Sequence, residues 1–161
     1  MTYTIRKAIK TDMPQVLALI KELAAFEREP DAVEVTLEEL EEEGFGQEPF
    51  FICFVAEMQE EIVGIALVYY RFSTWKGRSI HLEDLIVKES FRKYGIGKAL
   101  YSQVLKFARE QGIRRVEWVV LKWNTNAIEF YEKTGAQILK EWHIAQIDDK
   151  SIDEFLKKSK E

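Results

Sequence analysis

The chain has 161 residues, of which 47% are hydrophobic, and it carries a formal net charge of −5. This length and hydrophobic fraction predict one folded domain over residues 1–161 and exclude a mainly disordered chain. The negative charge argues against a nucleic-acid partner, because binding a phosphate backbone requires a basic surface.

The sequence carries no membrane-spanning or metal-binding signal. Its longest apolar stretch, Ile62 to Tyr70, is far shorter than the roughly 20 residues of a membrane-spanning helix. The first residues, Met1 to Arg6, lack the hydrophobic core of an export signal. With one cysteine, Cys53, and two histidines, we expect no internal disulfide and no metal site. These features predict a cytoplasmic protein that does not bind a membrane.

Hydrophobic spacing predicts strands and helices in a mixed order. Strands are expected at Tyr3–Ala8, Phe50–Glu57, Glu61–Phe72, Ser79–Val87 and Ile113–Leu121, with further strand character at Ala136–Ile147. Helices are expected after a Thr11–Asp12 cap as far as Phe26, near Leu37–Glu43, at Gly97–Gln111, at Asn126–Thr134, and after a capping box at Ser151–Glu154. Because three strands follow one another within this alternation, the predicted fold class is α/β (α+β), with a mixed, mostly antiparallel sheet flanked by helices.

Acidic residues are concentrated in one segment. The residues from Glu27 to Glu48 include ten acids and one base, Arg28, so this segment carries −9 and the rest of the chain +4. One interpretation is an acidic lip that attracts a cation beside a basic remainder that holds an anion. The other is a short helix near Leu37–Glu43 whose acidic face is simply solvated.

A loop between a strand and a helix has the composition of an anion site. The strand that ends at Val87 is followed by Arg92, Lys93, Gly95, Gly97 and Lys98, and the next helix begins there. Free main-chain N–H groups and the helix dipole favour an anion at such an N-terminus, and glycine lets a phosphate approach the backbone.

Two better-known phosphate motifs do not fit this loop. A P-loop requires glycine where Arg92 stands and a hydroxyl residue where Ala99 stands. A dinucleotide fingerprint that starts at Gly95 requires its third glycine at Leu100.

A second polar turn leads into a short helix that ends in aromatic residues. It contains Trp123 and Asn124, then Phe130 and Tyr131, then Gly135. The two motifs, in this order and each after a strand, resemble the GNAT family of acetyl-coenzyme A-dependent N-acetyltransferases. From Thr4 to Ala136 the chain is also similar to the spermidine/spermine (diamine) N-acetyltransferases and their thialysine-acetylating relatives within that family.

The resemblance implies a role for each motif. Acetyl-CoA would be the acetyl donor, with its pyrophosphate on the main-chain amides from Lys93 to Lys98 and its pantetheine arm along the strand end at Leu85–Val87. The implied cofactor-binding residues are Leu85, Ile86, Val87, Arg92, Lys93, Tyr94, Gly95, Ile96, Gly97, Lys98, Asn124, Thr125, Asn126 and Ala127.

The resemblance also implies the acceptor side of the site. Tyr131 would be the general acid, Glu83 the catalytic carboxylate on the substrate side, and Phe26 with Glu27 part of the amine pocket. A homodimer is implied as well.

Two departures from the polyamine enzymes bear on the substrate. Those enzymes carry Asp before Pro-Trp, where this chain has Ser73 and Thr74 before Trp75, and they carry Glu where this chain has Lys122. One amine-binding carboxylate is therefore missing and one charge is reversed. These changes disfavour long polyamines and leave a shorter diamine, thialysine or another primary amine open.

Several of these residues also have a purely structural interpretation. Neighbouring strand residues point to opposite faces, so one of Glu83 and Asp84 is expected to be solvated; we favour Glu83 for the site and leave Asp84 unassigned. Tyr131 could be a half-buried aromatic residue. We expect His81 on the strand surface and Cys53 in the core.

The sequence therefore predicts transfer of an acetyl group to the primary amine of a small cationic substrate (a diamine, polyamine or thialysine-like amine), by direct attack in a ternary complex. The alternatives are acetylation of a protein lysine or N-terminus, and a non-catalytic acyl-CoA-binding regulatory module.

Overall fold

A computed structural model describes residues 2–158 of the chain. The strands are β1 (Thr4–Lys7), β2 (Ile52–Met58), β3 (Glu61–Ser73), β4 (Gly77–Val87) and β5 (Val116–Glu117). The helices are α1 (Met13–Phe26), α2 (Leu37–Phe45), α3 (Ile96–Glu110), α4 (Thr125–Lys133) and α5 (Asp149–Lys158), with short 3-10 helices at Lys10–Asp12 and Glu89–Phe91. None of the helices described is long and apolar enough to cross a membrane.

The chain forms two compact units that divide at Val119 and Val120. The first contains all five strands with α1, α2 and α3, and the second contains α4 and α5. A single domain over residues 1–161 stays a prediction.

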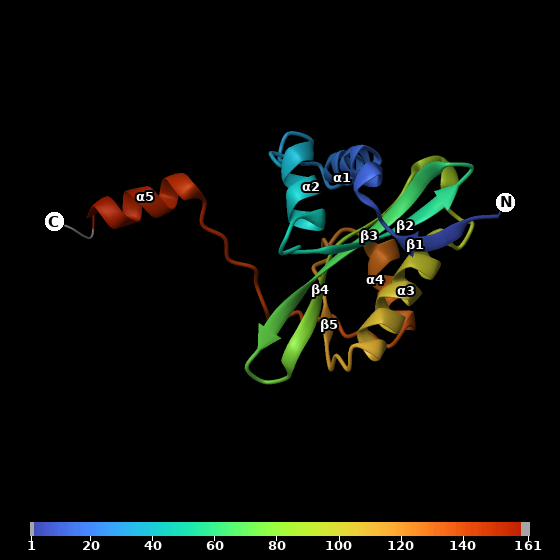
Figure 1. The fold of residues 1–161 in the computed structure, drawn as a ribbon. Helices are drawn as coiled ribbons and strands as arrows, with labels where there is room; N and C mark the ends of the chain where they lie inside the picture. The colour runs from blue at the N-terminus through green and yellow to red at the C-terminus, as the bar shows by residue number, and fades with distance from the viewer. Residues whose placement is uncertain (1, 159–161) are drawn as a thin grey trace. The chain divides into compact units, whose positions relative to one another are not determined.

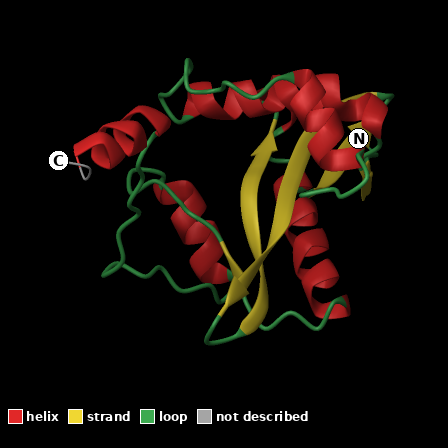
Figure 2. Cartoon of the chain, turned by 60° about the vertical axis from the view of Figure 1, so that its left-hand side comes forward, coloured by secondary structure: helices red, strands yellow, loops and turns green. Residues whose placement is uncertain are grey.

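The five strands form one sheet in the order β1-β2-β3-β4-β5. The first four are antiparallel, and β5 is parallel to β4. The longest strands, β3 and β4, form a twisted ribbon (Figure 2). The predicted fold class, a mixed and mostly antiparallel sheet with helices, is therefore confirmed.

The sheet is covered on both faces, with α1 and α2 on one face and α3 on the other (Figure 1). The core under α1 and α2 includes Leu19, Cys53 and Leu67, and the thiol of Cys53 is a core group as expected. On the opposite face Phe54 packs edge-on against Phe107 of α3 with ring centroids 5.6 Å apart. Because both faces are buried, β3 is almost continuously apolar and does not alternate with polar residues.

Two predicted strands are wrong for the same reason. The strand expected at Ile113–Leu121 is reduced to Val116–Glu117, which, in the part of the chain that the structure describes, pairs only with Ile80 and His81 of β4. The segment Ala136–Ile147 forms no strand. A strand requires a partner for its main-chain groups, and a sequence pattern does not supply that partner.

The structure differs from the prediction at two helix caps. At α5 the cap is Asp148, whose Oδ1 accepts a hydrogen bond from the N–H of Ser151 (2.8 Å), so Ser151 lies inside the helix. At α1 the N-cap residue is Asp12, as predicted, but its side chain makes no capping hydrogen bond and instead binds Arg6 (2.7 Å) and the N–H of Ile9 (2.8 Å).

The acidic segment divides into two parts. Helix α2 is capped by Thr36 and Glu39, buries Leu40 and exposes Glu38 and most of its other acids, as expected for a solvated face. Glu27, at the end of α1, lies apart from that helix and belongs to the site described below.

Candidate functional site

The loop before α3 presents main-chain N–H groups without acceptors. The first N–H of this region to bond within the helix is that of Ala99, which donates to the carbonyl of Gly95 (3.0 Å). Within the described residues, the N–H groups from Gly95 to Lys98 have no hydrogen-bond acceptor. Arg92, Lys93 and Lys98 are exposed beside them. This arrangement suits an anion with several oxygen acceptors.

The backbone of this loop is held in left-handed conformations. Gly95 has φ +78°, and Lys93 has φ +73°, which costs a non-glycine residue about 1–2 kcal/mol. At Gly97 a Cβ would lie 3.7 Å from Val87 Cγ2, an ordinary contact, so internal packing does not exclude a side chain there. The bare backbone at Gly97 instead leaves space for an anion to approach the loop closely.

The strand before the loop has an open edge. Within the described residues, β5 pairs with β4 only at Ile80 and His81, so Leu82–Val87 pairs only with β3. The N–H of Lys88 donates to Val63 of β3 (2.9 Å), so Ile86 also bonds toward β3, while Leu85 and Val87 direct their main-chain groups to the open edge. This edge can pair with an extended ligand, and Leu85 and Val87 rather than Ile86 carry the groups that face it.

A bulge in β4 changes the expected direction of the two carboxylates. Leu67 of β3 is paired with Asp84 and the next residue, Val68, with Leu82, so Glu83 is an extra, unpaired residue. Leu67 lies in the core under α1, so Asp84 faces α1 as well. Glu83 contacts His81, which is paired with Tyr69 on the same face. The expectation that Glu83 and Asp84 point to opposite faces is therefore wrong.

Glu83 is fixed by two neighbours on that face. Tyr69 donates its hydroxyl hydrogen to Oε2 of Glu83 (3.1 Å), and Nε2 of His81 lies 3.4 Å from the same oxygen. The hydrogen bond from His81 is the largest cause that holds the pKa of Glu83 below its usual range. The Glu83 side chain is 51% exposed, so the ionised carboxylate remains open to a ligand.

Two further carboxylates interact with Glu83. Asp84 is partly buried, and its burial, followed by the charges of Glu83 and Glu27, raises its pKa to about 6. At Glu27, burial and then the charge of Glu83 raise the pKa. Since like charges raise one another's pKa, the three carboxylates together favour a bound cation. The predicted pair of Glu27 and Glu83 is thus brought together, with Asp84 as a third member.

Arg92 connects the end of α1 with the end of β4. Its guanidinium lies 5.4 Å from the ring centre of Phe26, and its Nε donates to the carbonyl of Val87 (3.1 Å). Phe26, expected in the amine pocket, therefore lies beside the loop before α3 as well as beside Glu27.

The remaining predicted site residues lie in the second unit. Asn124 caps α4 by accepting a hydrogen bond from the N–H of Ala127 (3.3 Å), which places Asn124–Ala127 in the first turn of that helix. Tyr131 is 8% exposed, and its ring centre lies 5.3 Å from that of Phe130. The roles of these residues stay predictions.

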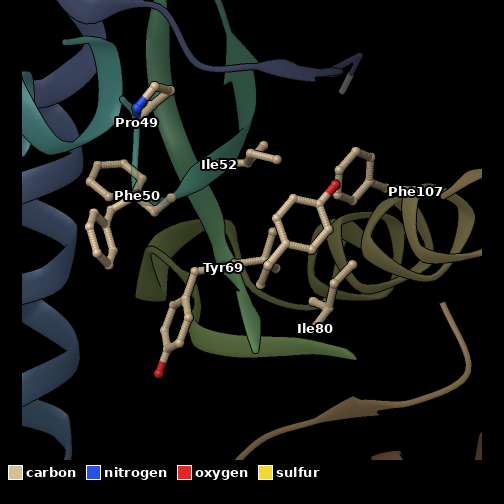
Figure 3. Close-up of a pocket in the computed structure, with 9 residues that line it drawn as sticks. Pro49, Phe50, Ile52, Tyr69, Ile80 and Phe107 are labelled. Carbon is tan, nitrogen blue, oxygen red and sulfur yellow. The ribbon is translucent and has the colours of Figure 1, made fainter. Parts of the chain in front are cut away.

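A separate pocket in the first unit is apolar. Figure 3 shows Pro49 and Phe50 at one side of it and Phe107 at the other. Its lining residues are Pro49, Phe50, Phe51, Ile52, Val68, Tyr69, Tyr70, Ile80 and Phe107. None of these is ionised at neutral pH, so this pocket does not provide the charge of the carboxylate site.

Sequence reasoning missed three residues on the α1 face of the sheet: Tyr69, His81 and Asp84. The sequence carries no signal for this bulge, because Ile80, Leu82 and Ile86 stay in phase as alternate residues of one strand. The phase change appears only in the structure, where Ile86 lies in the core under α1 and Leu82, paired with Val68, lies on the other face.

Comparisons with known proteins agree with this architecture. Residues 15–136 match the Acetyltransferase (GNAT) family. The chain is 38% identical over 162 aligned positions to a thialysine N-epsilon-acetyltransferase of Bos taurus, covering 94% of this chain and 95% of that protein. It is 34% identical to a spermidine/spermine N(1)-acetyltransferase-like protein 1 of Homo sapiens, over 88% of this chain and 22% of that longer protein.

A solved structure shows the same fold. AAC(6')-Iy in complex with the bisubstrate analog CoA-S-monomethyl-acetylneamine has a TM-score of 0.75 at 21% identity, covering 92% of this chain and 99% of that chain. The resemblance to the GNAT family and to its thialysine and spermidine/spermine branch is therefore confirmed. Since the family match covers most of the chain and the relatives carry N-acetyltransferase names, this chain belongs to the GNAT acetyltransferase family and is an amine N-acetyltransferase.

Proposed function

We propose that this enzyme transfers the acetyl group of acetyl-CoA to the primary amine of a small cationic substrate, by direct attack in a ternary complex. The observation that carries the proposal is the order of groups on β4. The carboxylates at Glu83 and Asp84 stand directly before the open edge at Leu85 and Val87. Because a strand rises roughly 3.3 Å per residue, an amine bound at the carboxylates and an acetyl donor bound along the edge lie close together.

The donor side uses main-chain groups. When bound, acetyl-CoA supplies the activated acetyl group. The N–H groups from Lys93 to Lys98 bind its pyrophosphate, and the open edge at Leu85 and Val87 orients the thioester arm. An outward N–H at this edge also stabilises the negative charge that develops on the acetyl oxygen during attack.

The acceptor side binds a cation and then removes its proton. An alkylammonium has a pKa of about 10.4, so almost all of the free amine is charged at neutral pH. Glu83, Asp84 and Glu27 attract this cation, and the proton leaves through water. Asp84 has a pKa raised to about 6, which suits it to hold the proton on its way out.

We assign the last proton transfer to Tyr131. A thiolate with a parent pKa of about 8.5 leaves more easily when an acid protonates it, and a phenol can donate that proton. Positioning amine and thioester together can supply about 7–11 kcal/mol of the barrier reduction, so no covalent nucleophile is required.

The carboxylate cluster favours a small amine over the alternatives. A cluster of three acids, two on β4 and one at the end of α1, suits a compact ammonium, whereas a protein lysine would need contacts for its flanking peptide. A regulatory module has no need for adjacent carboxylates whose pKa values move in opposite directions. Homodimer formation and a cytoplasmic location remain predictions.

Acetyl-CoA consumption measured with putrescine, spermidine, spermine, thialysine, lysine and a lysine peptide tests the function. We expect turnover with thialysine or putrescine, weaker turnover with spermine because Ser73 and Lys122 replace acids, and none with the peptide. Turnover of the peptide alone would favour protein acetylation. Acetyl-CoA binding without turnover of any amine would favour the regulatory module.

Gly95→Ala tests the donor loop. Alanine at φ +78° destabilises the loop by about 1 kcal/mol and displaces its N–H groups, so we expect the KM for acetyl-CoA to rise about tenfold. Gly112→Ala is the matched control, because Gly112 also has a positive φ (+65°) but lies after the other end of α3. Thermal melting should show similar losses for both variants, whereas steady-state kinetics should separate them. An equal KM in the two variants contradicts the assignment.

Glu83→Gln tests the acceptor carboxylate. The neutral amide neither attracts the ammonium nor helps to remove its proton, so we expect kcat/KM for the amine to fall about 100-fold with the KM for acetyl-CoA unchanged. Glu38→Gln removes the same charge from the exposed face of α2 and should leave kcat/KM near the wild-type value. If the two substitutions had equal effects, Glu83 would act only through the overall charge of the protein and not as a carboxylate of the site.

Tyr131→Phe tests the general acid. Loss of the hydroxyl should lower kcat about 100-fold and leave the KM for both substrates nearly unchanged, because the hydroxyl acts only as sulfur leaves. Tyr70→Phe is the control, because Tyr70 is a partly exposed tyrosine of β3 whose hydroxyl donates to Gln111 and has no proposed role in the reaction. Unchanged turnover of Tyr131→Phe removes the acid assignment and leaves the rest of the proposal standing.

A further inference from the structure

The α1-side face of the sheet carries a chain of polar contacts that runs from β5 to Glu83. Glu117 of β5 is paired in register with His81 of β4, and His81 with Tyr69 of β3. Arg71 lies two residues after Tyr69 on β3 and therefore shares its face. Both oxygens of Glu117 are held by arginines, Oε2 by Arg115 at 3.0 Å and Oε1 by a close ion pair with Arg71.

Arg71 also reaches the histidine ring. Its Nη1, which binds Glu117, lies 3.4 Å from Nδ1 of His81. A guanidinium can only donate hydrogen bonds, so Nδ1 must be the acceptor and carry no hydrogen. The single ring hydrogen then lies on Nε2, which faces Oε2 of Glu83 at 3.4 Å. A doubly protonated ring would direct a second N–H at the guanidinium, which has no acceptor.

The arrangement leaves one oxygen of Glu83 available. Oε2 is approached by the hydroxyl of Tyr69 and by Nε2 of His81, whereas Oε1 has no hydrogen-bond partner within the described residues. The side chain of Glu83 is half exposed and would otherwise sample several rotamers, at a cost of about 1–2 kcal/mol on ordering. Two donors on one oxygen remove that freedom and leave Oε1 available to a ligand.

We propose that His81 is a positioning residue, fixed as the Nε2–H tautomer by Arg71, that aims the Glu83 carboxylate at the acceptor amine. This inference rests on the proposed role of Glu83 in amine acetylation. The His81 side chain is only 12% exposed and stacks on Tyr69 with ring centres 5.2 Å apart, so it acts through Glu83 and does not meet the substrate directly. The long contact of 3.4 Å is expected to shorten when a cation binds the carboxylate.

Three substitutions at His81 separate hydrogen bonding from packing. Phenylalanine keeps the ring and its stacking on Tyr69 but has no N–H. The amide nitrogen of glutamine can take the place of Nε2, whereas that of the shorter asparagine takes the place of Nδ1. With thialysine as substrate, we expect His81→Phe and His81→Asn to lower kcat about tenfold, as loss of an orienting partner does, while His81→Gln stays near wild type. The KM for acetyl-CoA should not change.

Equal activity of the phenylalanine, asparagine and glutamine variants overturns the proposal, because a structural role would not discriminate between the two amides. A double-mutant cycle adds a second criterion. In the Glu83→Gln background, His81→Phe should cause no further loss, since its effect passes through that carboxylate. Independent losses from the two substitutions would also contradict it.

The tautomer provides a readout that does not depend on turnover. The chain has two histidines, so His143→Gln leaves His81 as the sole signal in long-range proton–nitrogen correlation spectra. We expect a hydrogen on Nε2 and none on Nδ1 in the wild type, with loss of this preference in Arg71→Met. A hydrogen on Nδ1 overturns the inference whatever the activity.

The two proposals can fail separately. If no amine is acetylated although His81 shows the Nε2–H tautomer and its signal moves in Glu83→Gln, the proposed function fails and the contact with Glu83 stands. If Glu83→Gln abolishes turnover while His81→Phe leaves it intact, the function stands and the positioning role fails.

Discussion

The site depends on one extra residue in β4. In a regular strand Glu83 and Asp84 would lie on opposite faces of the sheet, and only one of them could meet a substrate. The bulge at Glu83 places both on the face that α1 covers. The bulge also changes which residues direct their main-chain groups away from β3. Before it, this residue is Ile80, whose N–H donates to the carbonyl of Arg115; after it, these residues are Leu85 and Val87. A single inserted residue therefore determines both the charge of the acceptor side and the edge of the donor side.

The end of β4 lies between two sets of groups that lack partners of opposite charge or polarity within the described residues: the carboxylates near Glu83 and the main-chain N–H groups of the loop before α3. Glu27, Glu83 and Asp84 repel one another, which is why burial and charge together raise the pKa of Asp84 to about 6. The loop before α3 holds Lys93 in a strained conformation and leaves its N–H groups without acceptors among the described residues. Each arrangement lowers the stability of the free protein, and each is relieved by a ligand of the opposite charge. A cation and an anion therefore suit adjacent places on one strand.

The sequence predicted the features that local patterns specify. Glycines and cations before a helical repeat predicted the start of α3 to within one residue, and two apolar runs predicted the hairpin of β2 and β3. It did not predict the pairing of Asp84, because a bulge depends on the register with β3. It overestimated β5 because the chain after Glu117 leaves the edge of β4, which the local pattern does not show. Local chemistry was thus readable from the residues, whereas the choice between Glu83 and Asp84 required the tertiary structure.

The same residue pair ends the parallel ladder and begins the contacts to Glu83. His81 and Glu117 form the last pair between β4 and β5, and beyond them the edge is open. If the ladder continued past this pair, its hydrogen bonds would occupy the outward groups of β4 and close the edge to a ligand. If it ended earlier, Glu117 would no longer hold Arg71 beside His81. The site therefore sets both an upper and a lower limit on the length of β5, which is two residues.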